Sequence, residues 1–318
     1  MDYIHLGCSM NACPRCKQTH SVVKAGRRTT RKGTLQKWYC KHCGSYFSNI
    51  KQSYTQYPHH VILFAIDQYN RGYPISQVKT KIGRKYRYSP PERTLYSWIK
   101  RYNTLFTFTP MRKHYTIDPT TILTTHRFHH QQLYLFQYHS LKLNIVSKTF
   151  PQLRRYITWV EHHLPHTMFT QGPRMSQTQT TTTTTSQNKT NILPTITKHV
   201  LDLPHQPRHA HDLIENYLLI NDATTICAEL PVFLNPKEIN DHINQPITSP
   251  LTGHIDLLQV RNNNLYILDY KPNLNHPEHF QDQLVLYKQA VHKRTNIPLK
   301  RIVPAVFNKY SYYEFFEE

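Results

Sequence analysis

Two short apolar segments in the last quarter of the sequence each carry one aspartate. Asp256 lies within residues 253–258, Asp269 lies within residues 265–271, and three asparagines separate the two segments. Apolar runs of this length are typical of strands, and asparagines are typical of turns, so we expect a hairpin that brings both carboxylates together. Lys271 follows Asp269 by two residues and therefore points to the same strand face. Two carboxylates and a lysine suit a hard divalent cation and phosphodiester hydrolysis.

The alternative for these residues is a hairpin whose charged side chains face solvent. Ile255, Leu257, Ile267 and Leu268 lie next to the two acids. Strands this apolar are usually buried on both faces, and a buried carboxylate needs a partner or a metal ion. The metal site is therefore the favoured interpretation.

The motif order in this half of the chain resembles a known nuclease family. The pattern G-x-x-D at 253–256 followed by D-x-K at 269–271 resembles motifs II and III of the PD-(D/E)XK nuclease superfamily. Gln283 and Tyr287 resemble the Q-x-x-x-Y helix of its RecB-like branch, and His211 lies where that branch has a metal-binding histidine. The resemblance covers about residues 192–318 and implies a metal-dependent deoxyribonuclease with an αβββαβ restriction-endonuclease-like fold.

The resemblance also implies roles for single residues. Asp256 and Asp269 would hold Mg²⁺ or Mn²⁺ together with the backbone carbonyl of Tyr270, and Lys271 would position or activate the attacking water. His211 would add a ligand from the first helix, with His205 and His209 as rivals in the same stretch.

Further residues complete the expected site. Gln283 and Tyr287 share a helical face and would contact substrate phosphate or water. Glu229, on the first strand, could join the metal or its surroundings. Some RecB-like relatives hold an iron–sulfur cluster with four cysteines. Only Cys227 lies in this half of the sequence, so no such cluster is expected.

The elements that must position these residues can be predicted from apolar periodicity and turn signals. In chain order they are a helix over about 208–219, a strand over 225–233, strands at Asp256 and Asp269, a helix over 280–291 and a strand over 301–307.

Charge is distributed unevenly along the 318 residues. Residues 1–170 hold 26 Lys and Arg against 5 Asp and Glu, whereas residues 201–318 hold 10 against 14. A basic N-terminal half favours a polyanionic partner, and DNA is the natural candidate. No apolar run reaches the length of a membrane span, and the N-terminus lacks the features of a signal peptide, so we expect a cytoplasmic protein without membrane association.

Four cysteines occur as two C-x-x-C pairs, Cys13 with Cys16 and Cys40 with Cys43. This spacing lets four thiolates converge on one tetrahedral Zn²⁺, which predicts a closed structural site rather than disulfides. Cys8 could compete as a zinc ligand, but it lies five residues before Cys13, a spacing that fits a C-x-x-C zinc-binding turn poorly. Residues 1–50 are therefore expected to form a zinc ribbon.

Residues 51–105 show the pattern of three short helices. The third is expected to open at a capping box from Ser89 to Glu92 and to bury Leu95, Trp98 and Ile99. Its opposite face would read DNA in the manner of a recognition helix. That face comprises Arg93, Tyr96, Ser97, Lys100 and Arg101. With the ribbon, the stretch resembles the helix-turn-helix head of certain insertion-sequence transposases, which implies DNA binding.

The sequence therefore predicts a multidomain α+β chain. Its expected parts are a zinc ribbon (1–50), a helix-turn-helix (51–105), a helical connector (106–170) with helices near 129–147 and 152–164, a Thr/Gln-rich disordered linker (171–191) and a PD-(D/E)XK nuclease-like domain (192–318). The favoured function is a DNA nuclease, and the alternatives are a noncatalytic DNA-binding regulator on a nuclease-fold scaffold and an RNA-directed enzyme. The sequence assigns no oligomeric state.

Overall fold

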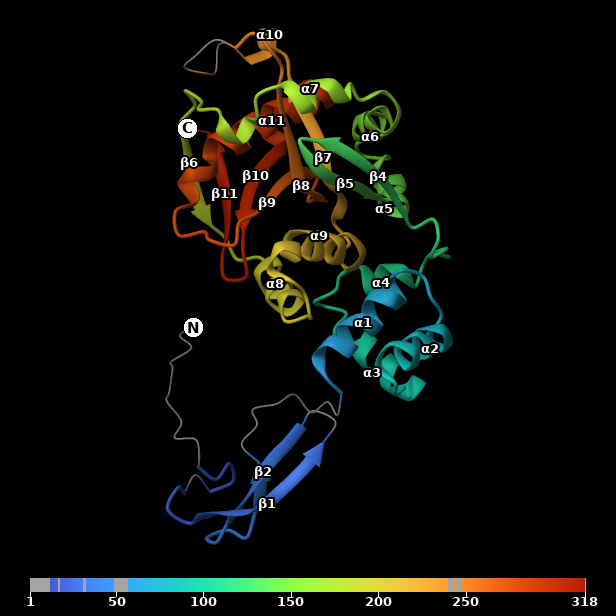
Figure 1. The fold of residues 1–318 in the computed structure, drawn as a ribbon, viewed down its shortest axis with the longest axis vertical. Coiled ribbons are helices and arrows are strands. Elements are labelled where there is room, and N and C mark those ends of the chain that lie inside the picture. Colours follow the sequence, from blue (N-terminus) through green and yellow to red (C-terminus); the bar gives the residue numbers. More distant parts are fainter. Residues whose placement is uncertain are drawn as a thin grey trace. The chain divides into compact units, whose positions relative to one another are not determined.

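The computed structural model describes residues 12–16, 18–30, 33–48, 57–239, 243 and 247–317. The chain divides into two compact units, Met1–Ile62 and Leu63–Glu318 (Figure 1). Both units mix helices or turns with sheet, so the expected α+β class is confirmed.

The smaller unit is built on a three-stranded antiparallel sheet. Its strands are β1 (Val22–Thr30), β2 (Gly33–Cys40) and β3 (Tyr46–Ser48), in that spatial order. A bulge interrupts the β1–β2 register between Lys24 and Arg27, and Gly26 there has a φ of 87° that favours glycine. The cysteine turns lie beside this sheet, at residues 13–16 and 40–43.

Three helices open the larger unit: α1 (His59–Asn70), α2 (Ile75–Tyr86) and α3 (Glu92–Arg101). The turn after α1 needs Gly72, because its φ is 107° and a Cβ there would lie 2.7 Å from the carbonyl oxygen of Ile117. The expected buried face of α3 is confirmed, since Leu95, Trp98 and Ile99 are all buried.

The expected start of the third helix is wrong in detail, and α2 begins in a similar way. Pro74 precedes α2, which ends where Arg87 adopts a left-handed conformation. No capping box forms at α3, because Ser89 donates its hydroxyl to the Lys79 carbonyl at 2.8 Å instead. Proline at both helix starts fixes a helix-compatible φ without a side-chain cap.

An eight-stranded mixed sheet forms the centre of the larger unit. In spatial order the strands are β4 (Leu123–His130), β5 (Gln132–His139), β7 (Thr225–Leu234), β8 (Leu251–Arg261), β9 (Asn264–Tyr270), β10 (Ile302–Phe307), β11 (Tyr312–Glu317) and β6 (Thr184–Asn188). β9 and β10 pair in parallel, and the other named pairs are antiparallel.

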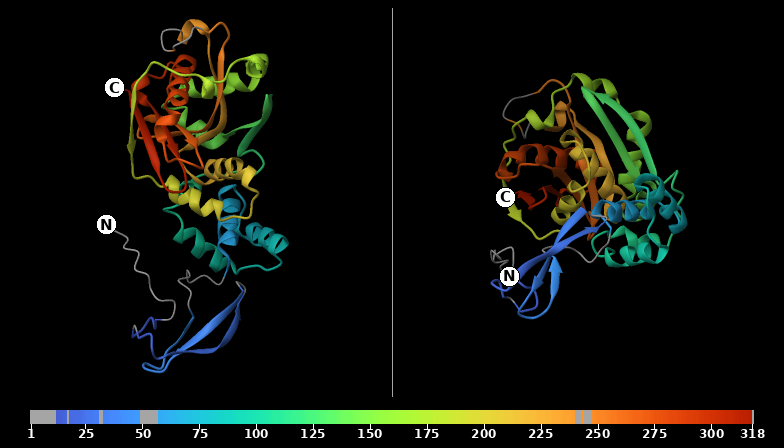
Figure 2. Two further views of the ribbon diagram at one scale, coloured as in Figure 1. Left: turned by 60° about the vertical axis from the view of Figure 1, so that its left-hand side comes forward. Right: turned by 60° about the horizontal axis from the view of Figure 1, so that its bottom comes forward.

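The larger unit contains further α-helices. They are α4 (Phe108–Arg112), α5 (Ser140–Val146), α6 (Pro151–His163), α7 (His166–Gln171), α8 (Leu193–Leu201), α9 (Ala210–Asn221), α10 (Pro236–Ile239) and α11 (Gln281–Thr295). The largest apolar core joins α6, α7 and α11 to the strands. Helix α9 contacts β5 and β7, and α8 and α9 lie between the sheet and α1–α3 (Figures 1 and 2). The six elements expected between residues 208 and 307 all form in the expected order.

The expected helical connector is wrong over much of its length. Only the helix near 152–164 forms as expected, as α6, whereas residues 129–147 contribute strands β4 and β5 before α5 begins. Tyr134, Phe136 and His139 are buried on β5, which pairs with β7. Aromatic side chains suit a half-buried pleated surface, and that tertiary contact overrides a helical pattern.

The expected disordered linker at 171–191 is also wrong. β6 pairs with β11 from Thr184 to Asn188, Met175 is fully buried, and Thr180 donates its hydroxyl to Asp282 at 2.7 Å. An edge strand needs backbone hydrogen bonds more than apolar side chains, and threonine favours extended backbone. Residues 106–191 therefore belong to the larger compact unit.

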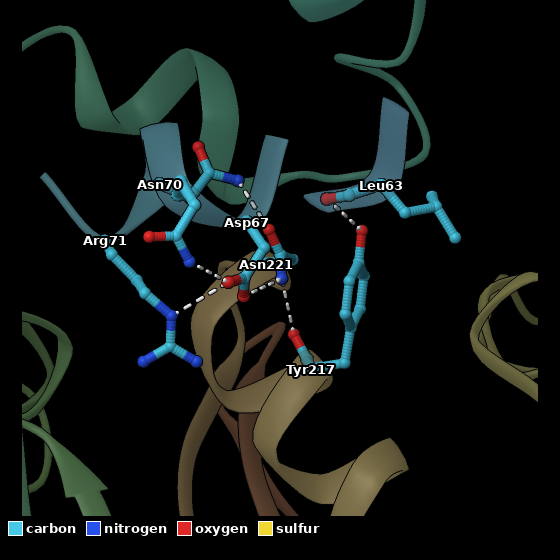
Figure 3. Close-up of polar contacts among 7 residues, drawn as sticks. Leu63, Asp67, Asn70, Arg71, Tyr217 and Asn221 are labelled. Atoms are coloured by element: carbon cyan, nitrogen blue, oxygen red, sulfur yellow. Dashed lines mark hydrogen bonds and ion pairs between the residues drawn. The ribbon is translucent and has the colours of Figure 1, made fainter. Parts of the chain in front are cut away.

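A buried polar network joins α1 to α9 (Figure 3). Asn70 donates to the Asn221 side-chain oxygen at 2.9 Å, and Asn221 donates to Asp67 at 3.3 Å. Arg71 forms an ion pair with Asp67 at 2.9 Å, while the Tyr217 hydroxyl donates to the Leu63 carbonyl at 3.5 Å. These contacts fix α1 against α9, the helix that also carries His211.

A buried lysine secures the far end of α9. The Lys142 ammonium donates to the carbonyl oxygens of Leu219 at 2.5 Å, Asp222 at 2.5 Å and Thr225 at 3.2 Å. Burial lowers the pKa of Lys142 to about 7. A cation on these carbonyls also complements the helix dipole.

The α1–α9 network predicts a stability effect. Asn221→Ala should destabilise the larger unit by roughly 1–3 kcal/mol, because it leaves buried Asn70 without its amide partner. Urea unfolding followed by circular dichroism measures this loss. Asn216→Ala is the matched control, since Asn216 lies on the same helix but bonds only locally, to the Asp212 carbonyl among the described contacts. Equal stability of the two variants would contradict a structural role for the network.

Candidate functional site

The β8–β9 hairpin brings Asp256 and Asp269 together. Asn262 and Asn263 form its turn with φ values of 49° and 59°, as a two-residue turn between twisted strands requires. Leu257 pairs with Leu268, so the next residues toward the open end are the two aspartates. The Tyr270 amide donates to Asp256 Oδ2 at 2.8 Å. Tyr270 thus reaches the site through its backbone N–H, and the role of its carbonyl as a metal ligand stays a prediction.

Helix α9 adds a histidine and a further acid. His211 Nδ1 lies 3.9 Å from Asp256 Oδ2, and ligand atoms of His211, Glu215 and Asp256 all lie within 4.8 Å of one another. The two α9 residues are one turn apart and share a face. The i, i+4 spacing predicts that Glu215 shares a helix face with His211, and the structure adds Glu215 to the candidate ligands.

The rival histidines lie elsewhere. His209 is exposed, and its Nδ1 lies 3.6 Å from Asp212 Oδ2. His205 is also exposed, and its Nδ1 lies 2.7 Å from the carbonyl oxygen of Leu203. Of these three histidines, His211 is the one that the structure brings to Asp256.

Glu229 lies on β7 beside the same carboxylates. Its neighbours Ala228 and Leu230 pair with Leu257 and Ile255 of β8, so Glu229 lies opposite Asp256. Its φ of 52° is uncommon for a non-glycine residue and stores strain of the kind that gathers at functional sites. Its Oε2 atom is buried without a hydrogen-bond partner among the described residues.

The carboxylates repel one another in a buried space. Burial, together with Asp212 and Asp269, raises the pKa of Glu229 to about 8. Burial and the neighbouring acids raise the pKa values of Asp256 and Glu215 well above their usual range. A divalent cation would offset this repulsion, and the unpartnered oxygens of Glu215 and Glu229 fit oxygen ligands of such an ion.

Lys271 is the cation nearest to Asp269. Its Nζ lies 2.7 Å from Asp269 Oδ2 and 5.0 Å from the centre of the Phe280 ring. Burial lowers the pKa of Lys271, but Asp269 and Asp256 outweigh burial and raise it overall. The side chain therefore stays protonated and acts as a fixed positive charge rather than as a base.

Helix α11 closes the site with Gln283 and Tyr287. Gln283 Nε2 donates to the Tyr287 hydroxyl at 2.8 Å and lies 3.5 Å from Asp269 Oδ1. The Tyr287 ring packs on Gly253, where a Cβ would lie 2.4 Å from ring atom Cε1. Burial and Asp269 raise the pKa of Tyr287 well above its usual range, so its phenol stays neutral. The glycine thus admits the ring that positions Gln283.

The four cysteines converge in the smaller unit. Sγ of Cys13 lies 3.5 Å from that of Cys43, and the Cys16 and Cys40 sulfurs are also 3.5 Å apart. Sulfurs about 2.3 Å from a tetrahedral zinc ion are separated by roughly 3.7 Å, so the cluster is consistent with structural Zn²⁺. Gly44 has a φ of 71° directly after the second pair. Cys8 lies outside the described residues.

The polar face of α3 is open to solvent. Each residue expected to contact DNA is exposed: Arg93, Tyr96, Ser97, Lys100 and Arg101. Such a cationic face with one aromatic ring suits a polyanion.

Comparison with known proteins does not identify the chain. No protein-family model matches the sequence, and no curated protein sequence matches it. Within the described residues, no helix is long and apolar enough to cross a membrane. Function is therefore inferred from the side-chain arrangement.

The cysteine cluster predicts one zinc ion per chain. Cys40→Ser should abolish zinc binding and unfold the smaller unit, because a three-thiolate site loses affinity and folding depends on the metal. Elemental analysis of purified protein measures the stoichiometry. Cys227→Ala, in the buried interior of β7, should retain one zinc per chain. Zinc-free wild-type protein that keeps its β1–β3 structure would contradict the assignment.

The raised pKa of Glu229 predicts a pH dependence without added divalent cation. Because the folded state binds this proton more tightly than the unfolded state, stability should fall as pH rises from about 5 to 8, by an amount on the order of 2–5 kcal/mol. Urea unfolding across this range measures the slope. Glu229→Gln should make the slope shallower, with the remainder due to Asp256 and Glu215, whereas Glu92→Gln, at an exposed glutamate, should leave it unchanged. An unaltered slope in Glu229→Gln would exclude Glu229 as its source.

Proposed function

We propose that the protein is a divalent-metal-dependent deoxyribonuclease with a PD-(D/E)XK core of the RecB-like type, targeted to DNA by its N-terminal half. The observation that carries the proposal is the convergence of four side chains: Asp256 from β8, Asp269 from β9, Lys271 directly after β9 and His211 from α9. Their residue types and order match the family motifs given above.

The element order supports this assignment. α9, β7, β8, β9, α11 and β10 follow one another in the αβββαβ order of the family core, with β7–β8–β9 antiparallel and β10 parallel to β9. The acids come from the hairpin, the histidine comes from the first helix, and Gln283 comes from the second helix. β4, β5, β11 and β6 extend this core at its two edges.

Asp256, Asp269, His211 and Glu215 would hold Mg²⁺ or Mn²⁺, and Glu229 lies close enough to add a carboxylate. The bound ion supplies Lewis-acid polarisation of the phosphate and a more acidic water. Lys271 keeps its proton, so it would steady the charge that develops on the phosphate or hold the attacking water by donating to it. Gln283, held by Tyr287, would donate its amide to a phosphate oxygen or to that water.

The helices α1–α3 would act as a helix-turn-helix, with the exposed face of α3 on DNA. The α1–α9 network fixes this three-helix group to the helix that carries His211 and Glu215. DNA bound at α3 would therefore lie at a constant distance from the carboxylates. A zinc ribbon with exposed Lys24, Arg27, Arg28 and Lys37 would add sequence-independent affinity. Cysteines that bind zinc as thiolates, rather than forming disulfides, are typical of the reducing cytoplasm. A cytoplasmic location would also give the protein access to DNA.

Two substitutions separate metal binding from charge stabilisation. Asp256→Asn should weaken Mn²⁺ binding and abolish cleavage, whereas Lys271→Met should retain Mn²⁺ binding and lose cleavage by about 10²–10³-fold. Calorimetric titration and cleavage of linear and circular DNA, on the same preparations, measure both quantities. Asp202→Asn, at an exposed acid directly after α8, is the control and should keep both properties.

Full cleavage activity in either site variant would rule out this catalytic centre. A wild-type protein that binds DNA yet cleaves neither substrate with Mg²⁺ or Mn²⁺ would instead support a noncatalytic DNA-binding regulator.

A further inference from the structure

A separate cavity of about 610 Å³ lies between α6 and the C-terminal end of α11. Its volume falls within the range of small-ligand sites. None of the carboxylate-site residues lines it, so the cavity is separate from that site. Its walls combine an aromatic group with a basic group.

The aromatic wall consists of Tyr156, Trp159 and Phe233. The Tyr156 and Trp159 rings are nearly parallel, with centroids 6.0 Å apart and planes at 13°, and Trp159 lies 6.0 Å from Phe233. Tyr156 is fixed by donating its hydroxyl to the Pro231 carbonyl at 2.8 Å. Trp159 is only partly buried, so part of its indole faces the cavity. A rigid, partly open indole is a stacking surface for another planar ring.

The basic wall consists of Arg155, Lys293 and Arg294. Arg155 and Lys293 are exposed, while Arg294 lies 4.3 Å over the Phe233 ring and is paired with Glu238. Among the described residues, no carboxylate lines the cavity. A ligand that fits both walls has a planar aromatic ring and a negative charge.

We propose that this cavity binds one nucleotide of a single-stranded nucleic acid, with its base on Trp159 and its phosphate between Arg155 and Lys293. This inference rests on the proposed nuclease function and names its substrate class as DNA with a single-stranded segment. Helix length relates the cavity to the carboxylates. Gln283 and Arg294 are eleven residues apart, about three turns and 16 Å along α11. The helix face between them is packed in the core, since Tyr287, Ala290 and Val291 are buried, so a strand that joins the two sites would cross the protein surface.

Binding of a fluorescein-labelled six-nucleotide oligothymidylate to the full chain, without added divalent cation, tests the charge requirement. Arg155→Gln with Lys293→Gln should weaken binding about tenfold and lower the slope of log affinity against log salt by roughly 1.4. Lys300→Gln with Lys309→Gln removes the same charge from exposed sites outside the cavity and should change affinity by less than about twofold. Equal weakening by the two double variants would show that affinity depends on net charge alone, which would overturn the proposal.

Two further measurements test the base contact. An abasic oligonucleotide of equal length should bind wild-type protein about tenfold more weakly than the oligothymidylate, because it cannot stack. Tryptophan emission should fall on titration with the oligothymidylate, and Trp159→Phe should lose this response while affinity changes by less than about twofold. Equal affinity for the abasic probe, or quenching that persists in Trp159→Phe, would place the base elsewhere.

Failure of this inference is distinguishable from failure of the nuclease proposal. Oligothymidylate binding is measured without cleavage, so an inactive enzyme leaves the cavity test intact. Lys100→Ala with Arg101→Ala, on α3, should weaken binding of duplex DNA and leave oligothymidylate binding unchanged. Loss of oligothymidylate binding in that variant would assign the single strand to α3 and overturn the cavity proposal.

Discussion

Mutual repulsion among buried carboxylates is the constraint around which the larger unit is organised. Asp269 is 2 % exposed and Glu215 is 4 % exposed, yet both share one space with Asp256 and Glu229. Desolvation of one such ion costs several kcal/mol, and each neighbour adds to that cost. Lys271 and His211 offset only part of it. The surrounding strands and helices must therefore be rigid enough to hold the acids in place against this repulsion.

Helix α9 connects this constraint to the rest of the molecule. One turn of the helix presents His211 and Glu215 to Asp256, and a later turn presents Tyr217 and Asn221 to α1. A shift of α9 would change both sets of contacts at once. The buried ammonium of Lys142 holds the last carbonyls of the helix against the start of β7, which limits such a shift.

The sequence predicts the elements that carry the buried carboxylates better than the parts that flank them. Residues 225–307 alternate between apolar runs and sharp turn signals, so each strand is visible locally. β4 and β5 are rich in histidine, and their strand character depends on burial against β7, which lies far away in sequence. β6 consists of polar residues, and its order comes from backbone pairing with β11. The position of Glu215 beside Asp256 likewise depends on how α9 docks.

The strand order also governs how the chain can fold as it is made. β5 pairs with β7 and β6 pairs with β11, so both edge segments precede their partners by long stretches of sequence. During synthesis these strands emerge with open edges and wait for residues that the ribosome has not yet added. Such non-local pairing slows folding and exposes strand edges to association with other chains. The sheet reaches its full width only when Tyr312–Glu317 has left the ribosome, which makes β11 the element that ends this vulnerable period.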